Sequence, residues 1–512
     1  MSNSHDALAR SLSRAAGFVD FGQLIAATAR RRGAAIALDD GQRTLSYEAF
    51  DARANRAAQA LLAAGLQLGE RIAVLAENRM EYLELAVAAA RTGVILCALN
   101  WRFSAAELKH CIALTTPQLV FVSPRHAALL DPTADLVTIV FGAAYEALLA
   151  PCHADEPPSV VTAEDAYIVL FTSGTTGAAK AAVISHRAEL ARLALGRIDS
   201  GLAPGDNFVA WAPLFHMVAL EHALHVLALG GTVHLVDGAD IERIVYLASH
   251  VPQWWLVLLP GMVDRVVEAF ARSGHHPAPL KMVGALADLV NPSLVAATSR
   301  LFNAPYWNTF GSTETGMLPF AGTRVAIGEQ PSSLAKAANS MHLFKLVDDG
   351  DREVMRGQPG EVAVRGPTLF SGYWQADETN AEDFRGGWFH MGDVFCARED
   401  GLFDYVDRVK YLIKTGAENV YPAEIERVLM SDARVLEAVV VRRPDHTWGE
   451  VPVALVCCEA PAPTAAELFA LCRAHLPGYK QPKDIRFVAS QTDFPRSTSG
   501  KIQRQALEQW VR

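Results

Sequence analysis

Residues 171 to 180 read Phe-Thr-Ser-Gly-Thr-Thr-Gly-Ala-Ala-Lys, directly after the apolar run Ala166-Tyr-Ile-Val-Leu170. The apolar run predicts a buried strand, and the segment after it predicts a loop rich in glycine and hydroxyl side chains. Glycines let backbone N–H groups approach an anion, hydroxyls donate further hydrogen bonds, and a lysine supplies positive charge. The segment is therefore typical of a phosphate-binding loop that follows a strand, and a flexible surface loop is the alternative.

The loop is not the common P-loop, which has the pattern G-x-x-x-x-G-K-[ST]. Counting from Gly174, the second glycine would fall at Ala179 and the hydroxyl residue at Ala181. No G-x-G-x-x-G motif follows a strand either, so kinases, GTPases and dinucleotide-binding enzymes are disfavoured.

The chain as a whole has 512 residues, of which 51% are hydrophobic, and a net charge of -10. Such a length predicts more than one domain, and the acidic balance argues against nucleic acid as a partner. No apolar run reaches the ~18 residues that a membrane span needs, and the N-terminus shows no secretory signal. The seven cysteines include no C-x-x-C pair, which argues against structural zinc and disulfides and predicts a cytoplasmic protein.

Helical and strand-like segments alternate through the first half of the chain. Helical spacing covers Tyr47 to Ala64 and Met80 to Thr92, while Arg71 to Leu75, Val94 to Leu99 and Leu119 to Val122 are strand-like. This alternation predicts an α/β fold with a largely parallel sheet and helices on both faces. We expect a large N-terminal domain of stacked αβ sheets.

The pattern changes after about Met341. Residues Leu343 to Gly366 are rich in β-branched residues and turns, which predicts a small antiparallel β subdomain. The last hundred residues show their own α+β pattern. We therefore expect a domain boundary near Lys410, with an N-terminal domain at 1–409 and a C-terminal domain at 410–512.

Five further segments, in order, resemble motifs of the adenylate-forming superfamily, which includes acyl-CoA synthetases, peptide-synthetase adenylation domains and luciferases. The loop at 171–180 is similar to its T-S-G-T-T-G-x-P-K-G motif. The other segments are Pro213-Leu-Phe-His216, Trp307-Asn-Thr-Phe-Gly-Ser-Thr-Glu314, Gly387-Trp-Phe-His-Met-Gly-Asp393, Asp407-Arg408 through Gly416, and Pro495-Arg-Ser-Thr-Ser-Gly-Lys501. Together with segments upstream, the resemblance covers nearly the whole chain.

The resemblance implies an AMP-forming acid–thiol ligase that uses ATP, Mg2+ and coenzyme A. Attack of a carboxylate on the α-phosphate of ATP joins two anions, so the site must supply positive charge. By the resemblance, Glu314 holds Mg2+, Thr313 bonds the phosphate, and Lys501 bridges the carboxylate and the α-phosphate. His216 either gates the acyl and thiol pockets or fills a polar niche in the core.

The resemblance also assigns nucleotide contacts. Asp393 binds the ribose hydroxyls with help from Arg408, and Phe310 packs on adenine where the family usually has tyrosine. Residues Gly284, Ala285 and Leu286 lie along the other adenine face, and Gly311 is a further nucleotide-binding residue. The phosphate loop comprises Thr172, Ser173, Gly174, Thr175, Thr176, Gly177 and Lys180.

The C-terminal domain is expected to be mobile. In the family it rotates between the two half-reactions about a hinge, which maps to Lys410. The rotation withdraws Lys501 and brings Gly416, Ala417 and Glu418 to the tunnel for the thiol arm of coenzyme A.

Three alanines replace a proline and two glycines of the family pattern: Ala179, Ala181 and Ala417. An alanine where glycine adopts positive φ costs ~1 kcal/mol or more. This suggests an alternative in which the enzyme adenylates poorly, works mainly on a preformed acyl-AMP, and depends on a separate adenylating enzyme. A non-catalytic nucleotide-binding regulator is a further alternative, against which the presence of Lys501, Glu314 and Asp393 together argues.

The sequence favours one branch of the superfamily, but it does not identify the acid substrate. The segment Pro213 to His216 lacks the aspartate of peptide-synthetase domains, and no L-G-G-x-S carrier motif is present, so a free CoA ligase is favoured. No buried cation is evident that would pair with a second carboxylate of the substrate. Medium-chain, aromatic and polycyclic acids stay open, as does a homodimer.

Overall fold

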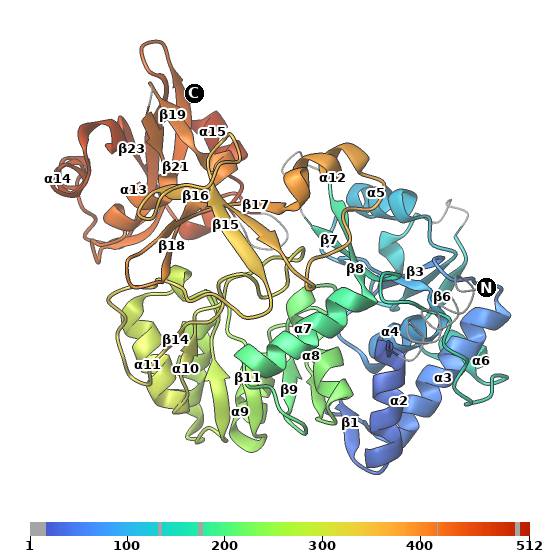
Figure 1. Ribbon diagram of the computed structural model, residues 1–512. Helices are drawn as coiled ribbons and strands as arrows, with labels where there is room; N and C mark the ends of the chain where they lie inside the picture. Colours follow the sequence, from blue (N-terminus) through green and yellow to red (C-terminus); the bar gives the residue numbers. More distant parts are fainter. Residues whose placement is uncertain (1–16, 132–135, 173–177, 417, 497–501) are drawn as a thin grey trace. The chain divides into compact units, whose positions relative to one another are not determined.

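The computed structural model describes residues 17–131, 136–172, 178–416, 418–496 and 502–512 (Figure 1). The chain forms two compact units. The first comprises Met1–His342 and Arg365–Glu382, and the second comprises Leu343–Val364 and Asp383–Arg512. The predicted α/β fold class is confirmed. The domain boundary expected near Lys410 stays a prediction.

A six-stranded sheet in the first unit carries the phosphate-loop segment. Its strand order is β6-β5-β3-β4-β7-β8, and every pair is parallel except β7 with β8. The strands are β3 (Arg71–Leu75), β4 (Ile95–Ala98), β5 (Leu119–Val122), β6 (Thr138–Val140), β7 (Ala166–Thr172) and β8 (Lys180–Ser185). The sheet is parallel because helices connect its strands, as the alternating pattern predicted.

An eight-stranded sheet forms the rest of the framework of the first unit. Its order is β14-β13-β12-β11-β9-β10-β1-β2, with antiparallel pairs only at the two edges. The strands are β1 (Ile36–Asp39), β2 (Thr44–Ser46), β9 (Phe208–Ala210), β10 (Val233–Leu235), β11 (Gln253–Leu256), β12 (Leu280–Val283), β13 (Tyr306–Trp307) and β14 (Arg324–Val325).

Helices α7 (His186–Asp199) and α8 (Met217–Ala228) lie between these two sheets (Figure 1). His186 of α7 stacks on Tyr167 of β7, with ring centroids 4.8 Å apart. His222 of α8 packs against Trp254 of β11, with centroids 5.4 Å apart. The two helices therefore carry polar side chains into the layer between the sheets.

Helix α4 (Met80–Thr92) shows how closely this unit is packed. All thirteen of its residues are buried. Small alanines on several faces let neighbouring elements approach, and Gly93 ends the helix with φ of 73°. The remaining α-helices among the described residues of the unit are α2 (Phe21–Arg32), α3 (Tyr47–Ala63), α5 (Ala105–Thr115), α6 (Ala143–Leu149), α9 (Ile241–His250), α10 (Val263–Ser273), α11 (Pro292–Phe302) and α12 (Asp377–Asp383). The last residue of α12 falls in the second unit.

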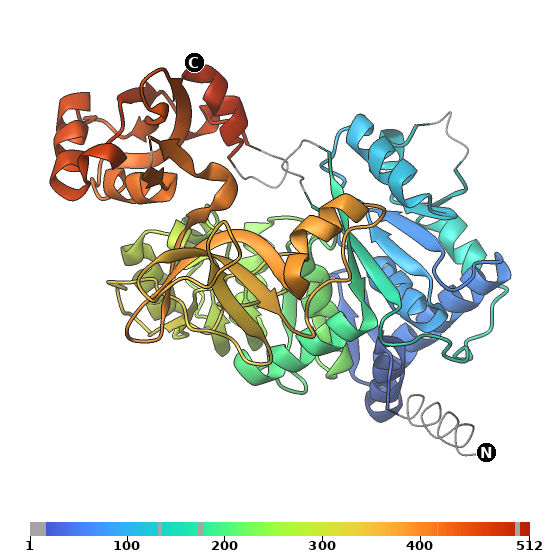
Figure 2. The same ribbon diagram turned by 45° about the horizontal axis from the view of Figure 1, so that its top comes forward.

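The second unit contains two sheets (Figure 2). The predicted β subdomain is a four-stranded sheet of β15 (Leu343–Val347), β16 (Pro359–Arg365), β17 (Phe389–Ala397) and β18 (Phe403–Arg408). The other sheet comprises β19 (Ile413–Thr415), β20 (Glu418–Val420), β21 (Val435–Asp445), β22 (Gly449–Cys458) and β23 (Asp484–Val488). Its helices are α13 (Pro422–Leu429), α14 (Ala465–His475) and α15 (Arg504–Trp510). No helix in the described ranges is long and apolar enough to cross a membrane.

Candidate active site

The loop expected to bind phosphates leaves and re-enters the six-stranded sheet at paired positions. Thr172 ends β7, Lys180 begins β8, and the two are antiparallel partners. The loop is therefore anchored at both ends on one edge of the sheet. Five residues of the loop lie outside the described residues: Ser173, Gly174, Thr175, Thr176 and Gly177.

Tyr373 joins two residues that the sequence assigned to the nucleotide. Its hydroxyl donates a hydrogen bond of 2.7 Å to Oε1 of Glu314. The Nζ atom of Lys180 lies 4.7 Å from the centroid of the Tyr373 ring, which is within the range of a cation–π contact. The N–H of Phe370 donates to the carbonyl oxygen of Glu314 at 2.8 Å. The structure thus brings Lys180 and Glu314 together through a tyrosine that the motifs did not reveal.

Thr313 and Glu314 occupy a tight turn closed between Ser312 and Gly316. The N–H of Gly316 donates to the carbonyl oxygen of Ser312 at 2.9 Å, and the reverse bond is 3.1 Å long. Gly311 packs against this turn, because a Cβ added there would lie 2.1 Å from the carbonyl oxygen of Gly316. The turn therefore fixes the backbone on both sides of Glu314.

The residues expected beside adenine gather at the carboxyl ends of β12 and β13. Gly284 has φ of 79°, and an added Cβ would lie 2.1 Å from the ring of Tyr306. The Tyr306 hydroxyl donates to the carbonyl oxygen of Ala285 at 3.2 Å. Phe310 follows β13, and its ring centroid is 6.3 Å from that of Phe320. The carboxyl ends of parallel strands are where α/β sheets place their ligands.

His216 stands at the N-cap of α8 and is half-buried. Its ring centroid is 4.8 Å from that of Phe215, which makes an edge contact of 5.8 Å with Trp101. These aromatic rings follow β9 and β4, so an apolar wall lies at the carboxyl ends of both sheets. Both roles that the sequence allowed for His216 stay open.

Lys336 corrects the expectation that no buried cation is evident. Its side chain is only 1% exposed, and its Nζ donates to Oδ2 of Asp288 at 2.5 Å and to Oδ1 of Asn308 at 2.7 Å. Burial lowers the pKa of the Lys336 ammonium, and Asp288 opposes that effect. Sequence reasoning missed it because burial of a lysine depends on partners distant in the chain; the surrounding alanines, Ala335, Ala337 and Ala338, were the available signal.

Asp393 and Arg408 face each other in the second unit. They are partners across β17 and β18, and the guanidinium of Arg408 binds both carboxylate oxygens of Asp393 at 2.9 Å. Asp393 is buried, and its charge raises the pKa of Arg408. The two residues that the motifs assigned to the ribose therefore form one bidentate pair.

The residues expected at the hinge and the thiol tunnel also lie in the second unit. Lys410 is in a short 3-10 turn, Val409–Tyr411, and its carbonyl oxygen accepts a 3.3 Å hydrogen bond from Arg442. Gly416 has φ of 63°, and its N–H donates to the carbonyl oxygen of Trp448 at 2.7 Å. Glu418 begins β20 and is exposed. Ala417 and Lys501 lie outside the described residues.

Ala179 and Ala181 are buried without the backbone strain that the sequence suggested. Neither has positive φ, and Ala181 is paired with Phe171 inside β8. Both belong to the apolar cluster that covers one face of the six-stranded sheet. His110 adds a contact, since its Nε2 lies 3.1 Å from the carbonyl oxygen of Ala179. The strain premise is wrong for Ala181, because a residue within a strand accommodates a Cβ, and Ala179, which directly precedes β8, has no positive φ either.

The acidic groups near the loop suit Mg2+ rather than a metal held by protein alone. No group of three His, Cys, Asp or Glu side chains within the described residues could hold a metal ion. Magnesium is commonly bound by one or two carboxylates together with substrate phosphates and water. A single carboxylate at Glu314, beside a phosphate-loop lysine, fits that donor set.

Comparisons with known proteins agree with this arrangement. The family model described as AMP-binding enzyme matches residues 25–374, and the model described as AMP-binding enzyme C-terminal domain matches residues 424–501. A feruloyl-CoA synthase from Amycolatopsis sp is 32% identical over 485 residues, covering 93% of this chain and 95% of that protein. An indoleacetate–CoA ligase from Aromatoleum aromaticum is 30% identical over 485 residues, covering 92% and 94%.

Solved structures show the same fold along nearly the whole chain. The crystal structure of ATP-bound MatB from Rhodopseudomonas palustris superposes with a TM-score of 0.81 at 27% identity, covering 96% of this chain and 99% of that one. The anthranilate CoA ligase AuaEII in complex with anthranoyl-AMP superposes with a TM-score of 0.84 at 21% identity, covering 97% and 98%. The second likeness shows the fold alone.

Proposed function

The chain belongs to the AMP-binding enzyme family, and from this premise we propose that it is an acyl-CoA ligase acting through an acyl-AMP intermediate. In the first half-reaction a carboxylate oxygen of the acid attacks the α-phosphorus of ATP, and the bond to pyrophosphate breaks. In the second, the sulfur of coenzyme A attacks the acyl carbon, the bond to AMP breaks, and the thiol proton is released.

One observation carries the proposal: Lys180, Tyr373 and Glu314 meet at the mouth of the phosphate loop. The attack joins two anions, so preorganised positive charge and hydrogen-bond donors at the phosphates lower its barrier. Lys180 and the hydroxyl of Thr172 serve the phosphates, and Thr313 bonds a phosphate oxygen. Glu314 would hold Mg2+, which supplies charge neutralisation on the phosphate oxygens when bound.

The acid and the adenosine bind at the carboxyl ends of the strands in the first unit. Gly284, Ala285, Phe310 and Gly311 form the adenine site, and the absence of a side chain at Gly284 allows Tyr306 to pack beneath it. His216 and Phe215 border the acid. The aromatic rings there and the named substrates of the relatives favour an aromatic or arylaliphatic acid.

The second unit provides the remaining groups. Asp393 accepts hydrogen bonds from the ribose hydroxyls while Arg408 holds its carboxylate in place. Lys501 bridges the acid and the α-phosphate in the first step. The part of the chain after Lys410 then turns about that residue and brings Gly416, Ala417 and Glu418 to the thiol arm of coenzyme A. The turn at 409–411 supports a pivot, because few residues need to change their dihedral angles there.

The alternative of a ligase that works mainly on a preformed acyl-AMP depends chiefly on backbone strain in the phosphate loop, and the first unit shows no such strain at the two loop alanines. Ala179 and Ala181 pack in the apolar cluster without positive φ. We therefore favour a complete ligase that forms its own acyl-AMP.

The test follows both half-reactions with a panel of acids. Purified protein receives ATP, Mg2+, coenzyme A and ferulate, indoleacetate, anthranilate, 2-succinylbenzoate or fatty acids; pyrophosphate and thioester are measured. A second series supplies coenzyme A with synthetic acyl-AMPs. Pyrophosphate and thioester from a free acid support the complete ligase, whereas thioester from acyl-AMP alone supports the alternative.

Two variants test the alternative that the chain is a nucleotide-binding regulator without catalytic activity. Lys501→Ala and Glu314→Gln should each abolish most pyrophosphate release while the protein stays folded. If no acid and no acyl-AMP gives product, and Lys501→Ala binds ATP like the parent, the chain is a nucleotide-binding regulator instead.

A further inference from the structure

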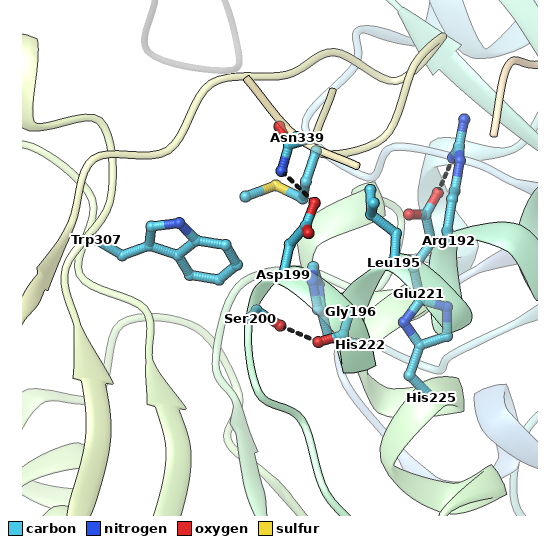
Figure 3. Close-up of a pocket in the computed structure, with 11 residues that line it drawn as sticks. Arg192, Leu195, Gly196, Asp199, Ser200, Glu221, His222, His225, Trp307 and Asn339 are labelled. Carbon is cyan, nitrogen blue, oxygen red and sulfur yellow. Dashed lines mark hydrogen bonds and ion pairs between the residues drawn. The ribbon is translucent and has the colours of Figure 1, made fainter. Parts of the chain in front are cut away.

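Arg192 is a buried arginine on α7 that none of the motifs includes. Its residue is 4% exposed, and its Nη1 forms an ion pair with Oε1 of Glu221 on α8 (Figure 3). Both side chains border a cavity of about 20 Å3, which has room for about one water molecule. Since so little of Arg192 is exposed, most hydrogen bonds of its guanidinium must come from the protein.

The guanidinium binds three separate segments of the first unit. Nε donates to the carbonyl oxygen of Thr368 at 3.0 Å, Nη2 donates to the carbonyl oxygen of Thr313 at 3.0 Å, and Nη1 reaches Glu221. The stem of the side chain passes under Gly316, where an added Cβ would lie 3.0 to 3.2 Å from three Arg192 atoms. A planar fork of five donors can span such partners, whereas a lysine ammonium cannot.

The two carbonyl partners flank the groups that orient Glu314. Thr313 directly precedes Glu314 in the tight turn. Thr368 lies two residues before Phe370, whose N–H bonds the carbonyl oxygen of Glu314, and five before Tyr373, whose hydroxyl bonds its carboxylate. Arg192 therefore holds both sides of the Glu314 site to one helix.

The third partner extends this connection to the acid side of the site. Glu221 lies on α8, five residues after the N-cap residue His216. Its ion pair with Arg192 thus ties the helix beside the acid to the turn beside the phosphates.

We propose that Arg192 is a positioning residue for acyl-AMP formation, which holds the Thr313–Glu314 turn and the segment at 368–373 in register for MgATP. The proposal rests on the proposed function. Its distinguishing consequence follows from chemistry: acyl-AMP lacks the β and γ phosphates and the metal that Glu314 serves. Loss of Arg192 should therefore slow the first half-reaction and spare the second.

The test compares the two half-reactions in Arg192→Lys and the parent enzyme. We expect pyrophosphate release to fall about 10- to 100-fold, the order of effect known for a misplacement of about 1 Å, and the half-saturating Mg2+ concentration to rise. Thioester formation from synthetic acyl-AMP should stay within about 2-fold of the parent. Glu221→Gln should also lower pyrophosphate release relative to thioester formation. This variant replaces Arg192→Lys in the test if Arg192→Lys does not fold.

Two arginines provide matched controls. Arg91 is also buried and pairs with Asp51 and Asn55 on a neighbouring helix, away from the turn. Arg91→Lys should lower the rates of both half-reactions by the same factor, because it reduces the amount of folded protein. Arg197 is exposed on the same helix as Arg192, and Arg197→Gln should leave both rates unchanged.

Equal losses in both half-reactions of Arg192→Lys, as in Arg91→Lys, would overturn the positioning role and leave a structural one. Unchanged rates in both Arg192→Lys and Glu221→Gln would overturn it as well. A parent enzyme that forms no acyl-AMP from any acid, yet makes thioester from acyl-AMP, would overturn the complete ligase and this proposal together.

Discussion

Replacing Glu189 by glutamine should remove a pH dependence from the stability of the first unit. Glu189 lies on α7 with no exposed surface, and neither carboxylate oxygen has a hydrogen-bond partner. His225 on α8 brings Nε2 to 3.2 Å from Oε1 without forming a hydrogen bond. Burial raises the pKa of Glu189 to about 7, against an opposing effect of Arg192. His225 offers no positive charge, since burial lowers its pKa to about 4.

The sign and size of the effect follow from the difference between folded and unfolded protein. An ordinary glutamate has a pKa of 4.5, so between pH 4.5 and about 7 the folded protein binds more protons at Glu189 than the unfolded protein. Stability therefore falls as the pH rises through this window. At about 1.4 kcal/mol for each pKa unit, the full loss is about 3 kcal/mol, of which about 2 kcal/mol falls between pH 5 and pH 8.

Glutamine has nearly the same volume and does not ionise. The Glu189→Gln variant should therefore gain about 2 kcal/mol on the parent between pH 5 and pH 8. Urea unfolding followed by tryptophan fluorescence measures this, because the buried Trp254 and Trp255 report on the first unit. Glu268→Gln, at an exposed residue, is the control and should show no such change. A parent-to-variant difference equal at both pH values would refute the reasoning. Burial also raises the pKa of Glu221 to about 7. The stability of the variant should therefore still depend on pH through Glu221.

Three further substitutions test the site. Tyr373→Phe removes the hydrogen bond to Glu314; since a bond to a charged group contributes about 1.5–3 kcal/mol, kcat/KM for MgATP should fall about 10- to 100-fold with an unchanged melting temperature. Gly284→Ala places a Cβ 2.1 Å from the Tyr306 ring at positive φ, so unfolding should become easier by about 2 kcal/mol and ATP binding, followed by calorimetry, should weaken. Ala181→Gly should lower stability by about 1 kcal/mol and leave the rate of pyrophosphate release within about 2-fold.

Each has an outcome that would count against it. An unchanged kcat/KM in Tyr373→Phe would show that the hydroxyl does not orient Glu314. Wild-type ATP affinity in Gly284→Ala would place adenine elsewhere. A pyrophosphate rate about ten times higher in Ala181→Gly would favour the alternative in which adenylation is impaired by the loop alanines.

Local sequence patterns predicted the elements well because hydrophobic periodicity and turn residues are local properties. The strand at Arg71–Leu75 and the helix at Met80–Thr92 lie where alternation and helical spacing put them. The pattern at residues 343–366 predicts the antiparallel subdomain, but its sheet also contains β17 and β18. A hairpin alone buries too little apolar surface to be stable, so distant strands complete it.

The contacts that orient the site were not predictable in the same way. Tyr373 and Glu314 are 59 residues apart, and Arg192 and Thr313 are 121 apart. The motifs identified Glu314 and Thr313 by their neighbours in sequence, while their supporting partners depend on which segments the fold brings together. Ala181 shows the converse error: a substituted motif position suggested strain, and the strand pairing shows why alanine fits.

The division of the chain into two units limits where the polypeptide can be divided into fragments. The chain enters the second unit at Leu343, returns to the first at Arg365 and leaves it again after Glu382. A single break anywhere from residue 343 to 382 yields two fragments that each hold pieces of both units. Neither unit can therefore be expressed as one continuous fragment. A version of this enzyme split in that range would have to assemble the β15–β18 sheet from strands of both fragments.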